Sequence, residues 1–430
     1  MNILVIGSGG REHALLWALG KSARGSLNLF CAPGNAGIAQ IAECVQLNAT
    51  DVSSLAGFAE EKEIDLTIVG SEAPLAVGIV DEFERRGLAI AGASRAAARL
   101  ESSKAFAKDF MAHYSVPTAH YRIANSITEA HRILESGEFG GEDASVVIKA
   151  DGLAAGKGVI VAGSRSEATS AVNVLMEGRL VAPESTRRIV IEETLDGREA
   201  SLLLFADGRD YALMPAARDH KRVGDNDTGP NTGGMGAITD PSVLDDETLR
   251  RVVREVVEPT LEGAQAEGFP FRGVLFIGLM LTTNGLRVLE YNVRFGDPEA
   301  QAILVRLESD LIDVFEAIAH GRLGSLPVQW TNESSACVVL ASHGYPSRPE
   351  AGARIEGLER VAQLEDVRIF HAGTARSESG EWLTEGGRVL GITAAAQTLE
   401  SALQRCYSAV NDIHWDGMHY RRDIGKFGGQ

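Results

Sequence analysis

Short apolar runs separated by polar, helix-length segments open the chain. Four such runs occupy residues 1–6, 27–31, 64–69 and 88–91. Each has the length of a buried strand, and a helical pattern begins at Glu12 directly after the first. Strands that alternate with helices predict a parallel sheet. We therefore expect an α/β domain of Rossmann-like architecture at the start of the chain.

The pattern changes near Lys104, where paired apolar runs around glycine-rich turns replace the strand and helix alternation. Residues 145–149 and 158–162 form one such hairpin-like pair. Further strand-like runs at 335–341 and 388–393 precede a helical pattern at 399–410. At 430 residues the chain is long enough for several closely joined domains. The expected fold is a multidomain α/β and α+β protein, with domains at 1–103, 104–326 (including a mobile lid at about 120–191) and 327–430.

Composition narrows the classes of function. The chain is 44% hydrophobic and 23% charged, as in globular proteins, and its formal net charge is −18. Sequence-independent binding to nucleic acid or to an anionic membrane needs a cationic surface, so we expect neither partner. Four scattered cysteines without a C-x-x-C pair indicate neither a zinc site nor a disulfide framework. We expect a cytoplasmic protein that acts on small molecules.

The loop from Gly7 to His13 follows the first strand and opens a helix, a context in which backbone N–H groups can hold a phosphate. The dinucleotide fingerprint fails here. Its third glycine would fall at Glu12, and no acidic residue follows the second strand at Cys31–Pro33. A phosphate or sugar-phosphate cradle and a purely structural tight turn both stay open, whereas a nicotinamide cofactor is disfavoured.

A second glycine-rich loop, Asp151 to Gly158, carries one lysine among small residues and suits closure over a polyphosphate. It departs from a Walker A loop, because its glycines are one residue too close and a strand follows it. Lys149, on the preceding strand, and Lys104 could supply positive charge to the phosphates. The alternative is an ordinary hairpin with surface lysines.

Two further segments are rich in charge. The apolar run 190–195 ends with Glu192 and Glu193, and Glu199 follows; these positions could read adenine and hold ribose hydroxyls, or form a solvated strand edge. The stretch 218–236 is densely polar over a length that is unusual for an ordinary loop. We interpret it as a functional loop that meets charged substrates.

The sharpest pattern lies at 288–299. Strand alternation places Glu290, Asn292 and Arg294 on one face. A carboxylate and an amide oxygen are hard ligands suited to magnesium shared with phosphate oxygens, and an arginine beside them can clamp a transferring phosphoryl group. The alternative, a polar strand face paired with neighbours, leaves three such residues in need of partners. The pattern predicts use of magnesium-ATP to activate a small carboxylate.

Several long motifs resemble the phosphoribosylamine–glycine ligases, also called glycinamide ribonucleotide synthetases, of the ATP-grasp superfamily. They are GGREHAL at 9–15, APGNAG at 32–37, SKAFAKDFM at 103–111, IKADGLAAGKGV at 148–159, DHKRVGDNDTGPNTGGMGA at 219–237, NVRFGDPEAQ at 292–301, HAGT at 371–374 and GGRVLGIT at 386–393. The resemblance covers nearly the whole chain. It implies an ATP-grasp fold for the central domain.

The resemblance also implies a reaction: ATP-dependent joining of glycine to 5-phosphoribosylamine through a glycyl phosphate, in purine biosynthesis. Magnesium or manganese would be held by Glu290 and Asn292, and Arg294, Asp219 and Lys221 would act on the reacting groups. The residues implied to bind ATP are Lys104, Lys149, Gly156, Lys157, Gly158, Glu192, Glu193, Leu195 and Glu199. Those implied to bind the sugar phosphate are Gly9, Gly10, Asn35, Glu72 and Asp297. We expect a monomer, with a dimer as the alternative.

Three rival functions are distinguishable from this one. A formate-using or bicarbonate-using purine enzyme of the same superfamily is disfavoured by the loop at 219–237. A non-catalytic nucleotide sensor would be expected to lack Glu290, Asn292 or Arg294, and all three are present. A nicotinamide dehydrogenase is disfavoured by Glu12.

Overall fold

The N-terminal domain is built on a five-stranded parallel sheet with the order β3-β2-β1-β4-β5. A computed structural model of the chain describes residues 1–154, 158–178 and 188–426. The strands are β1 (Asn2–Gly7), β2 (Asn28–Pro33), β3 (Glu43–Cys44), β4 (Leu66–Val69) and β5 (Ile90–Ala91). The helices are α1 (Gly10–Leu19), α2 (Val52–Glu61), α3 (Glu72–Ala76) and α4 (Ile79–Arg85). Ile3 to Ile6 are fully buried, as expected for a parallel strand covered on both faces. The predicted α/β domain is confirmed.

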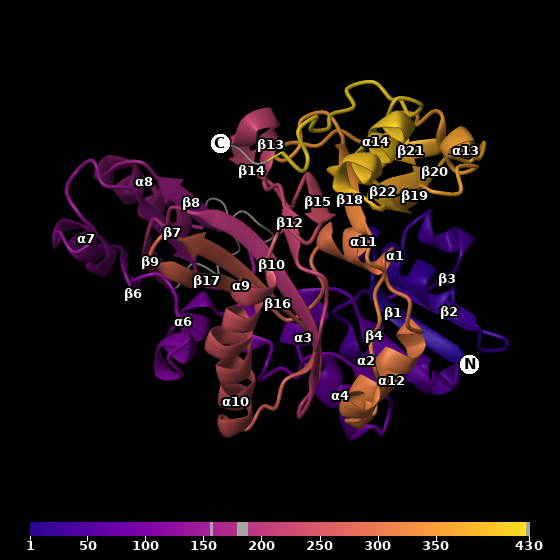
Figure 1. Cartoon of the computed structure of the whole chain (residues 1–430), viewed down its shortest axis with the longest axis horizontal. Coiled ribbons are helices and arrows are strands. Elements are labelled where there is room, and N and C mark those ends of the chain that lie inside the picture. The colour runs from indigo at the N-terminus through magenta and orange to yellow at the C-terminus, as the bar shows by residue number, and fades with distance from the viewer. Residues whose placement is uncertain (155–157, 179–187, 427–430) are drawn as a thin grey trace.

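A small antiparallel unit projects from the body of the molecule (Figure 1). Its sheet has the order β6-β9-β7-β8. Its elements are β6 (Tyr121–Ala124), α7 (Ile127–Glu135), β7 (Val146–Ala150), β8 (Val159–Ala162), α8 (Arg165–Met176) and β9 (Ile189–Glu193). It has an apolar core of its own, to which Ile148, Ile191 and Leu175 contribute. The hairpin predicted around residues 145–162 therefore exists, and it belongs to the region predicted as a lid.

A single nine-stranded sheet runs through the centre of the molecule and into its C-terminal part, with the order β17-β16-β10-β12-β15-β18-β22-β19 and β11 paired to β10. Its strands are β10 (Arg198–Asp207), β11 (Tyr211–Leu213), β12 (Ala217–Asp219), β15 (Gly236–Thr239), β16 (Arg272–Thr282), β17 (Gly285–Asn292), β18 (Ser334–Ala341), β19 (Arg368–His371) and β22 (Arg388–Ala396). The antiparallel pair β15 and β18 joins the two parts. The pattern of apolar runs did not predict this continuity, and the domain boundaries at 103 and 326 stay predictions.

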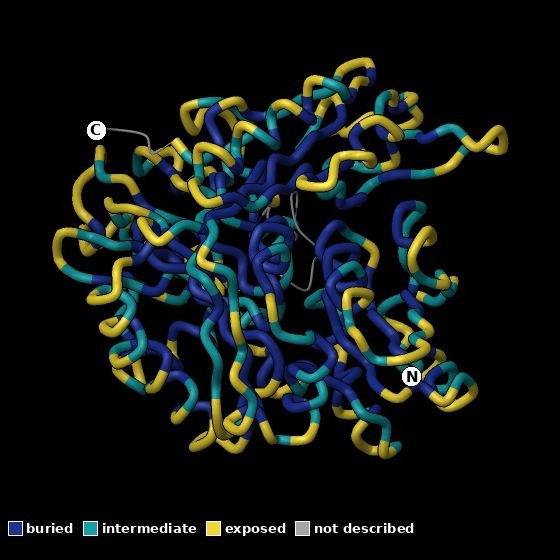
Figure 2. The backbone as a smooth tube through the Cα atoms, turned by 45° about the vertical axis from the view of Figure 1, so that its right-hand side comes forward, coloured by how far each residue is buried: buried dark blue, intermediate teal, exposed yellow. Residues whose placement is uncertain are grey.

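The remaining elements cover this sheet or form short ribbons. The helices are α5 (Arg99–Ser102), α6 (Lys104–His113), α9 (Asp246–Val252), α10 (Glu258–Ala266), α11 (Glu299–Leu304), α12 (Leu311–His320), α13 (Leu358–Val361) and α14 (Leu399–Val410). The ribbons pair β13 (Arg222–Gly224) with β14 (Thr228–Asn231), and β20 (Thr374–Arg376) with β21 (Trp382–Thr384). Buried positions concentrate inside these layers and exposed ones at turns and outer helix faces (Figure 2). In the described part of the chain, no helix has the length and apolar character needed to cross a membrane.

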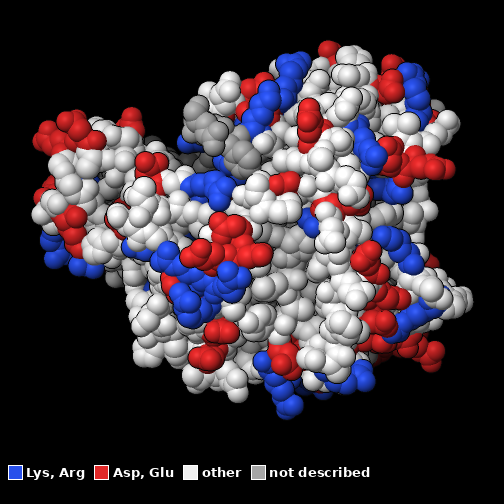
Figure 3. Space-filling model, viewed as in Figure 1, with Lys and Arg blue, Asp and Glu red and all other residues white. Residues whose placement is uncertain are grey.

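Acidic and basic side chains interleave on the face seen in Figure 3. Many of them form short surface pairs, such as Arg85 with Glu82 at 2.7 Å and Arg251 with Glu255 at 3.0 Å. Such exposed pairs contribute little to stability. The charged residues that matter for function lie instead in the cavity described next.

Candidate active site

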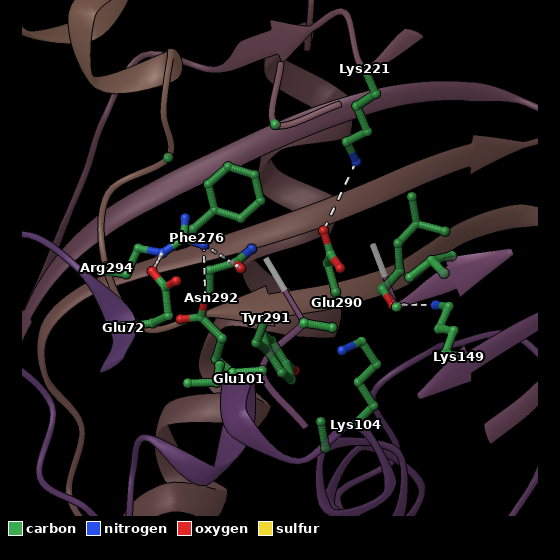
Figure 4. A pocket seen from close by; sticks show the side chains of 18 of the residues that line it. Glu72, Glu101, Lys104, Lys149, Lys221, Phe276, Glu290, Tyr291, Asn292 and Arg294 are labelled. Atoms are coloured by element: carbon green, nitrogen blue, oxygen red, sulfur yellow. Dashed lines mark hydrogen bonds and ion pairs between the residues drawn. The ribbon is translucent and has the colours of Figure 1, made fainter. Parts of the chain in front are cut away.

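A cavity of about 430 Å³ opens between the N-terminal domain, α6, the β6–β9 unit and the strands β16 and β17. Nearly half of the residues that line it are charged. The charged residues are Arg11, Glu72, Glu101, Lys104, Lys108, Lys149, Glu192, Asp219, Lys221, Glu290, Arg294, Asp297, Glu299 and Arg388. Figure 4 shows several of these side chains converging from β7, β17 and the polar loop after β12. Such a concentration of buried charge suits a charged, phosphate-bearing ligand.

Glu290 and Asn292 lie on one face of β17, as the alternation predicts, and both line the cavity. Tyr291 between them points the opposite way, is 2% exposed, and shares a 2.6 Å hydrogen bond with Thr260. Burial opposes ionisation of Glu290, but Lys221, Lys149 and Lys104 outweigh it and hold the pKa of its carboxyl below the ordinary value. Glu290 therefore presents a carboxylate to the cavity.

The donor set fits a magnesium-type ion. Among residues 1–154, 158–178 and 188–426, no three His, Cys, Asp or Glu side chains cluster as a complete metal cage. Magnesium is usually held by one or two protein oxygens and completes its shell with phosphate oxygens and water. One carboxylate and one amide oxygen beside a phosphate-sized cavity match that requirement.

Two predicted phosphate lysines converge on the cavity from different elements. Lys104 begins α6 and its Nζ donates to the carbonyl of Gly152 at 3.1 Å, on the loop after β7. Lys149 reaches across from β7 and donates to the carbonyl of Leu289 at 3.2 Å. Burial lowers the pKa of Lys104. An anion entering the cavity would offset that unfavourable desolvation.

Glu192 does not form the solvated strand edge considered from the sequence. Its side chain is 2% exposed and bridges two lysines, with Lys149 Nζ and Lys108 Nζ each 2.9 Å from a carboxylate oxygen. Lys108 also donates to Thr118 Oγ1 at 2.7 Å. A carboxylate held between two ammonium groups is not a free acceptor for ribose hydroxyls. Glu192 instead fixes both lysines at the cavity wall.

The other predicted ATP-binding residues divide into three groups. Gly158 lines the cavity, whereas Gly156 and Lys157 lie outside the described residues. Glu193 accepts a 2.7 Å hydrogen bond from the backbone of His120 and, like Leu195, does not line this cavity. Like these two residues, Glu199 does not line the cavity, but its carboxylate lies 3.3 Å from the Nζ of Lys221, which does.

Arg294 is fixed by four acceptors, one of which is the backbone carbonyl of Phe295 at 3.0 Å. Its guanidinium lies 2.8 Å from Glu101 and 3.2 Å from Glu72, and it donates to Asn292 Oδ1 at 3.1 Å. Glu72 was predicted to bind a sugar phosphate, but it lines the same cavity as Arg294 and pairs with it. The arginine is thus anchored beside the predicted metal pair.

Asp219 and Lys221 enter the cavity from the polar loop that the sequence singled out. They share the charged neighbours Glu199 and Glu290 and also act on each other. Glu199 and Asp219 raise the pKa of Lys221 well above its ordinary value, whereas burial raises that of the Asp219 carboxyl. Glu299, at the start of α11, is 4% exposed, and burial with Asp219 nearby raises its pKa to about 8. Burial therefore raises the pKa of both carboxyl groups in this corner.

Comparison with known proteins decides the family. Models of phosphoribosylglycinamide synthetase match the chain with the N domain over 1–101, the ATP-grasp (A) domain over 102–300 and the C domain over 335–427. The chain belongs to the phosphoribosylglycinamide synthetase family. It is an ATP-dependent ligase of three domains, as the sequence motifs predicted.

Individual relatives agree with this family over their full lengths. Phosphoribosylamine–glycine ligases of Brucella melitensis biotype 1 and Xanthomonas axonopodis pv. citri are each 46% identical, with 99% of this chain and 97% of each relative covered. The crystal structure of the Thermotoga maritima ligase is 34% identical with a TM-score of 0.84, covering 99% of this chain and 100% of that one.

A second cavity, of about 680 Å³, lies between the N and C domains of the synthetase. Gly9, Asn35 and Asp297 line it, together with Thr374, Arg376 and Arg388. Asp297 and Arg388 line both cavities, and Arg388 Nη2 lies 3.1 Å from Asp297 Oδ2. This ion pair marks the place where the two cavities meet.

The glycine-rich turn before α1 is partly filled by the protein itself. Glu12 Oε2 accepts the N–H of Gly9 at 2.6 Å, so this donor is not free for a phosphate. A Cβ on Gly70 would stand 2.3 Å from Glu12 Oε1, so the buried carboxylate needs glycine at that position. Gly10 is buried as the first residue of α1. One of the backbone donors that a dinucleotide-binding turn offers to a pyrophosphate is therefore already occupied here.

The side chain of Asn35 connects three loops by hydrogen bonds. Its Nδ2 donates to the carbonyls of Ser8 at 2.8 Å and His371 at 3.0 Å, and its Oδ1 accepts from Gly37 and Ile38, each at 2.9 Å. Every polar atom of the side chain is therefore used inside the protein. A ligand contact from this residue would have to come from its backbone.

Five charged cavity residues were quoted in motifs or passed over without a role: Arg11, Glu101, Lys108, Glu299 and Arg388. A signal existed for Lys108, which lies four residues after Lys104 and so on the same helix face. The others depend on contacts between distant segments, such as that of Arg388 with Asp297. Sequence spacing carries no sign of these contacts.

Proposed function

We propose that this chain joins glycine to 5-phosphoribosylamine, with ATP converted to ADP and phosphate and glycyl phosphate as the intermediate. The observation that supports it most directly is the pair of cavities that meet at Asp297 and Arg388. The first cavity has the lysines and the hard oxygen ligands that a nucleoside triphosphate and its metal ion require. The second cavity is a polar space between the N and C domains. A two-step reaction with a labile intermediate requires such adjoining sites.

In the first step, a carboxylate oxygen of glycine attacks the γ-phosphorus of ATP, and the bond from that phosphorus to the ADP oxygen breaks. Lys104 and Lys149 hold the phosphates, while Glu290 and Asn292 would hold magnesium or manganese. The metal neutralises charge on the phosphate oxygens when bound. Arg294, locked by Glu72 and Glu101, offsets charge near the transferring group without having to reorganise.

In the second step, the amine of phosphoribosylamine attacks the acyl carbon. A C–N bond forms, the C–O bond to phosphate breaks, and the nitrogen loses a proton. The sugar phosphate occupies the cavity between the N and C domains, near Gly9, Asn35 and Asp297, so that its amine approaches past the Asp297–Arg388 pair. Asp219 and Lys221 orient glycine. Positioning accounts for most of the catalysis, since no nucleophilic side chain is required.

Acyl phosphates react with water, so the intermediate needs shelter. The β6–β9 unit contributes Lys149, Gly152 and Gly158 to the cavity wall. We propose that this unit moves as a lid that closes during the first step. Quenching of a fluorophore on α8 upon ATP addition would report that movement, and an unchanged signal would argue against it.

Hydroxylamine trapping tests the activated carboxylate. With ATP and magnesium, the chain should form glycine hydroxamate and ADP, but no hydroxamate from formate. A bicarbonate-dependent release of ADP without glycine would instead support the superfamily rival. Absence of ADP formation with every acid would favour a nucleotide sensor. Formation of glycinamide ribonucleotide after addition of phosphoribosylamine completes the test.

A further inference from the structure

The polar loop between β12 and β15 is held from behind by a segment near the C-terminus. Asp219 and Lys221 line the cavity, whereas His220 between them is 3% exposed and does not line it. The backbone N–H of Gly425 donates to His220 Nε2 at 2.9 Å. The two cavity residues are thus backed by a contact with a residue about 200 positions away in the sequence.

The tip of the same loop is tied to the same segment. Arg421, with a side chain that is 1% exposed, donates to the carbonyl of Arg222 at 3.1 Å and to Asp227 Oδ1 at 2.6 Å. Asp423 accepts from Arg421 at 2.7 and 2.8 Å, and from the backbone N–H of Asn226 at 2.7 Å. One buried arginine therefore connects loop and segment through fixed geometry.

Further bonds run along the seam. Asp225 Oδ1 accepts the backbone N–H of Arg422 at 2.7 Å, and His419 Nε2 lies 2.7 Å from the carbonyl of Val223. The β13–β14 ribbon lies beside this part of the chain in Figure 1. Loop and segment thus exchange donors and acceptors in both directions.

The loop adopts a backbone that needs this support. Asn226 and Asp227 have φ values of 55° and 52°, in the left-handed region that L-residues seldom occupy in succession. Both residues are bonded directly to the segment, Asn226 through its N–H and Asp227 through its carboxylate. Without Arg421 and Asp423, the preferred backbone of these two residues would differ.

His220 is in the form that the contact requires. Burial, with Arg421 and Arg218 nearby, lowers its pKa to about 4, against the weaker opposing effect of Asp227 and Asp423. The ring is therefore neutral near pH 7. Since Nε2 accepts from Gly425, the proton resides on Nδ1.

We propose that the segment from His419 to Gly425 positions Asp219 and Lys221 for the amino-acid substrate, with His220 and Arg421 as the positioning residues. The proposal rests on the function proposed above, in which these two residues orient glycine. In this proposal the C domain supports the amino-acid subsite of the first cavity, and it also contributes lining residues to the second cavity.

Paired variants of His220 in the full chain test the proposal. His220→Leu removes the acceptor for Gly425, and the KM for glycine should rise by roughly tenfold while that for ATP changes by less than about twofold. His220→Gln places an amide oxygen near the position of Nε2, and the KM for glycine should stay within about threefold of the unaltered chain. This split between substrates is not expected from a loss of stability alone.

Other outcomes overturn the proposal. Equal rises in both KM values, an unchanged glycine KM in His220→Leu, or a His220→Gln variant as impaired as His220→Leu would each contradict positioning. If His220→Leu does not fold, Asp423→Asn, which keeps an acceptor for Asn226 but weakens the pair with Arg421, must show the same split. Absence of glycine turnover in the unaltered chain would refute the proposed function itself and this proposal with it.

Discussion

Arg294 donates to Asn292 Oδ1 over 3.1 Å, so the amide oxygen proposed as a metal ligand already accepts a hydrogen bond from the guanidinium. The same guanidinium compensates the charges of Glu72 and Glu101. Burial raises the pKa of the Glu101 carboxyl. Arg294 therefore links the metal pair to two carboxylates from the region before α6.

Arg294→Met should abolish turnover and destabilise the fold. Removing one partner of a buried ion pair leaves the carboxylates uncompensated, which costs about 3–5 kcal/mol of unfolding free energy. Adding Glu101→Gln to that variant should recover part of the stability and none of the activity. Urea unfolding of the four proteins in this double-mutant cycle provides the measurement; strictly additive effects would contradict the coupling.

Glu290→Gln should lower kcat by roughly 100-fold or more, because the amide cannot offer the charge that a divalent ion requires. Size and hydrogen-bonding capacity are kept, so circular dichroism and Tm should change little. Asn292→Asp is the matched control, since it retains an oxygen ligand and should stay measurably active. Manganese binding followed by electron paramagnetic resonance checks the assignment without turnover; unaltered manganese affinity in Glu290→Gln would refute it.

Glu299→Gln should stabilise the protein increasingly as the pH rises. The folded-state pKa of about 8 lies above the ordinary value of 4.5, so folding favours the protonated acid. Below about pH 4.5 both states are protonated and the variant gains nothing. Between pH 4.5 and 8 only the unfolded state loses the proton, so the advantage of glutamine grows and then levels off, reaching at least about 1 kcal/mol near pH 8.5.

Thermal unfolding of both proteins between pH 5 and 9 measures this difference. Glu299 lies close to Asp219, so the two carboxyl groups titrate as a pair and the transition should be broad. An advantage that is constant over this range would show that the residue is ionised throughout.

Three buried histidines should make the fold sensitive to mild acid. Burial lowers the pKa of His13 to about 3 and those of His220 and His371 to about 4, below the ordinary 6.5. Above pH 6.5 both states are neutral and nothing is lost. As the pH falls from 6.5 toward 4, the unfolded state alone binds protons, so stability falls by up to about 1.4 kcal/mol per pH unit for each histidine.

Urea unfolding between pH 7.5 and 5 in the Glu299→Gln background, which removes the opposing titration of the Glu299 carboxyl, gives the slope. His220→Gln serves as the control and should remove about one third of it, since one of three equal contributions is lost. An identical slope in the variant would mean that His220 is charged in the folded protein.

Local chemistry explains what the sequence could predict. Alternation along one strand placed Glu290, Asn292 and Arg294 on a common face, and the structure has the first two on β17 with Arg294 just beyond it, all lining one cavity. Lys104 and Lys149 reach that cavity as well. These predictions depended on the alternation of side chains along a strand and on residue type, both of which can be read from a few neighbouring positions.

Other features depended on partners that sequence spacing cannot reveal. Glu192 looked like an exposed strand end, but lysines from α6 and β7 enclose it. Asn35 was predicted to contact the sugar phosphate, and its side chain also ties the loop after β2 to His371, more than 300 residues later. In each case the role is set by tertiary contacts, which override local propensity.

The pairing of β15 with β18 joins the ATP-grasp domain and the C domain into one continuous hydrogen-bonded sheet. Four residue pairs, from Gly236 with Val338 to Thr239 with Ser335, fix their register. A chain cut between these strands would expose a bare sheet edge, a template for aggregation. A chimera of two relatives would therefore have to take both strands from the same parent. The β15–β18 pairing, more than the loops around it, limits which chimeras of the family can fold.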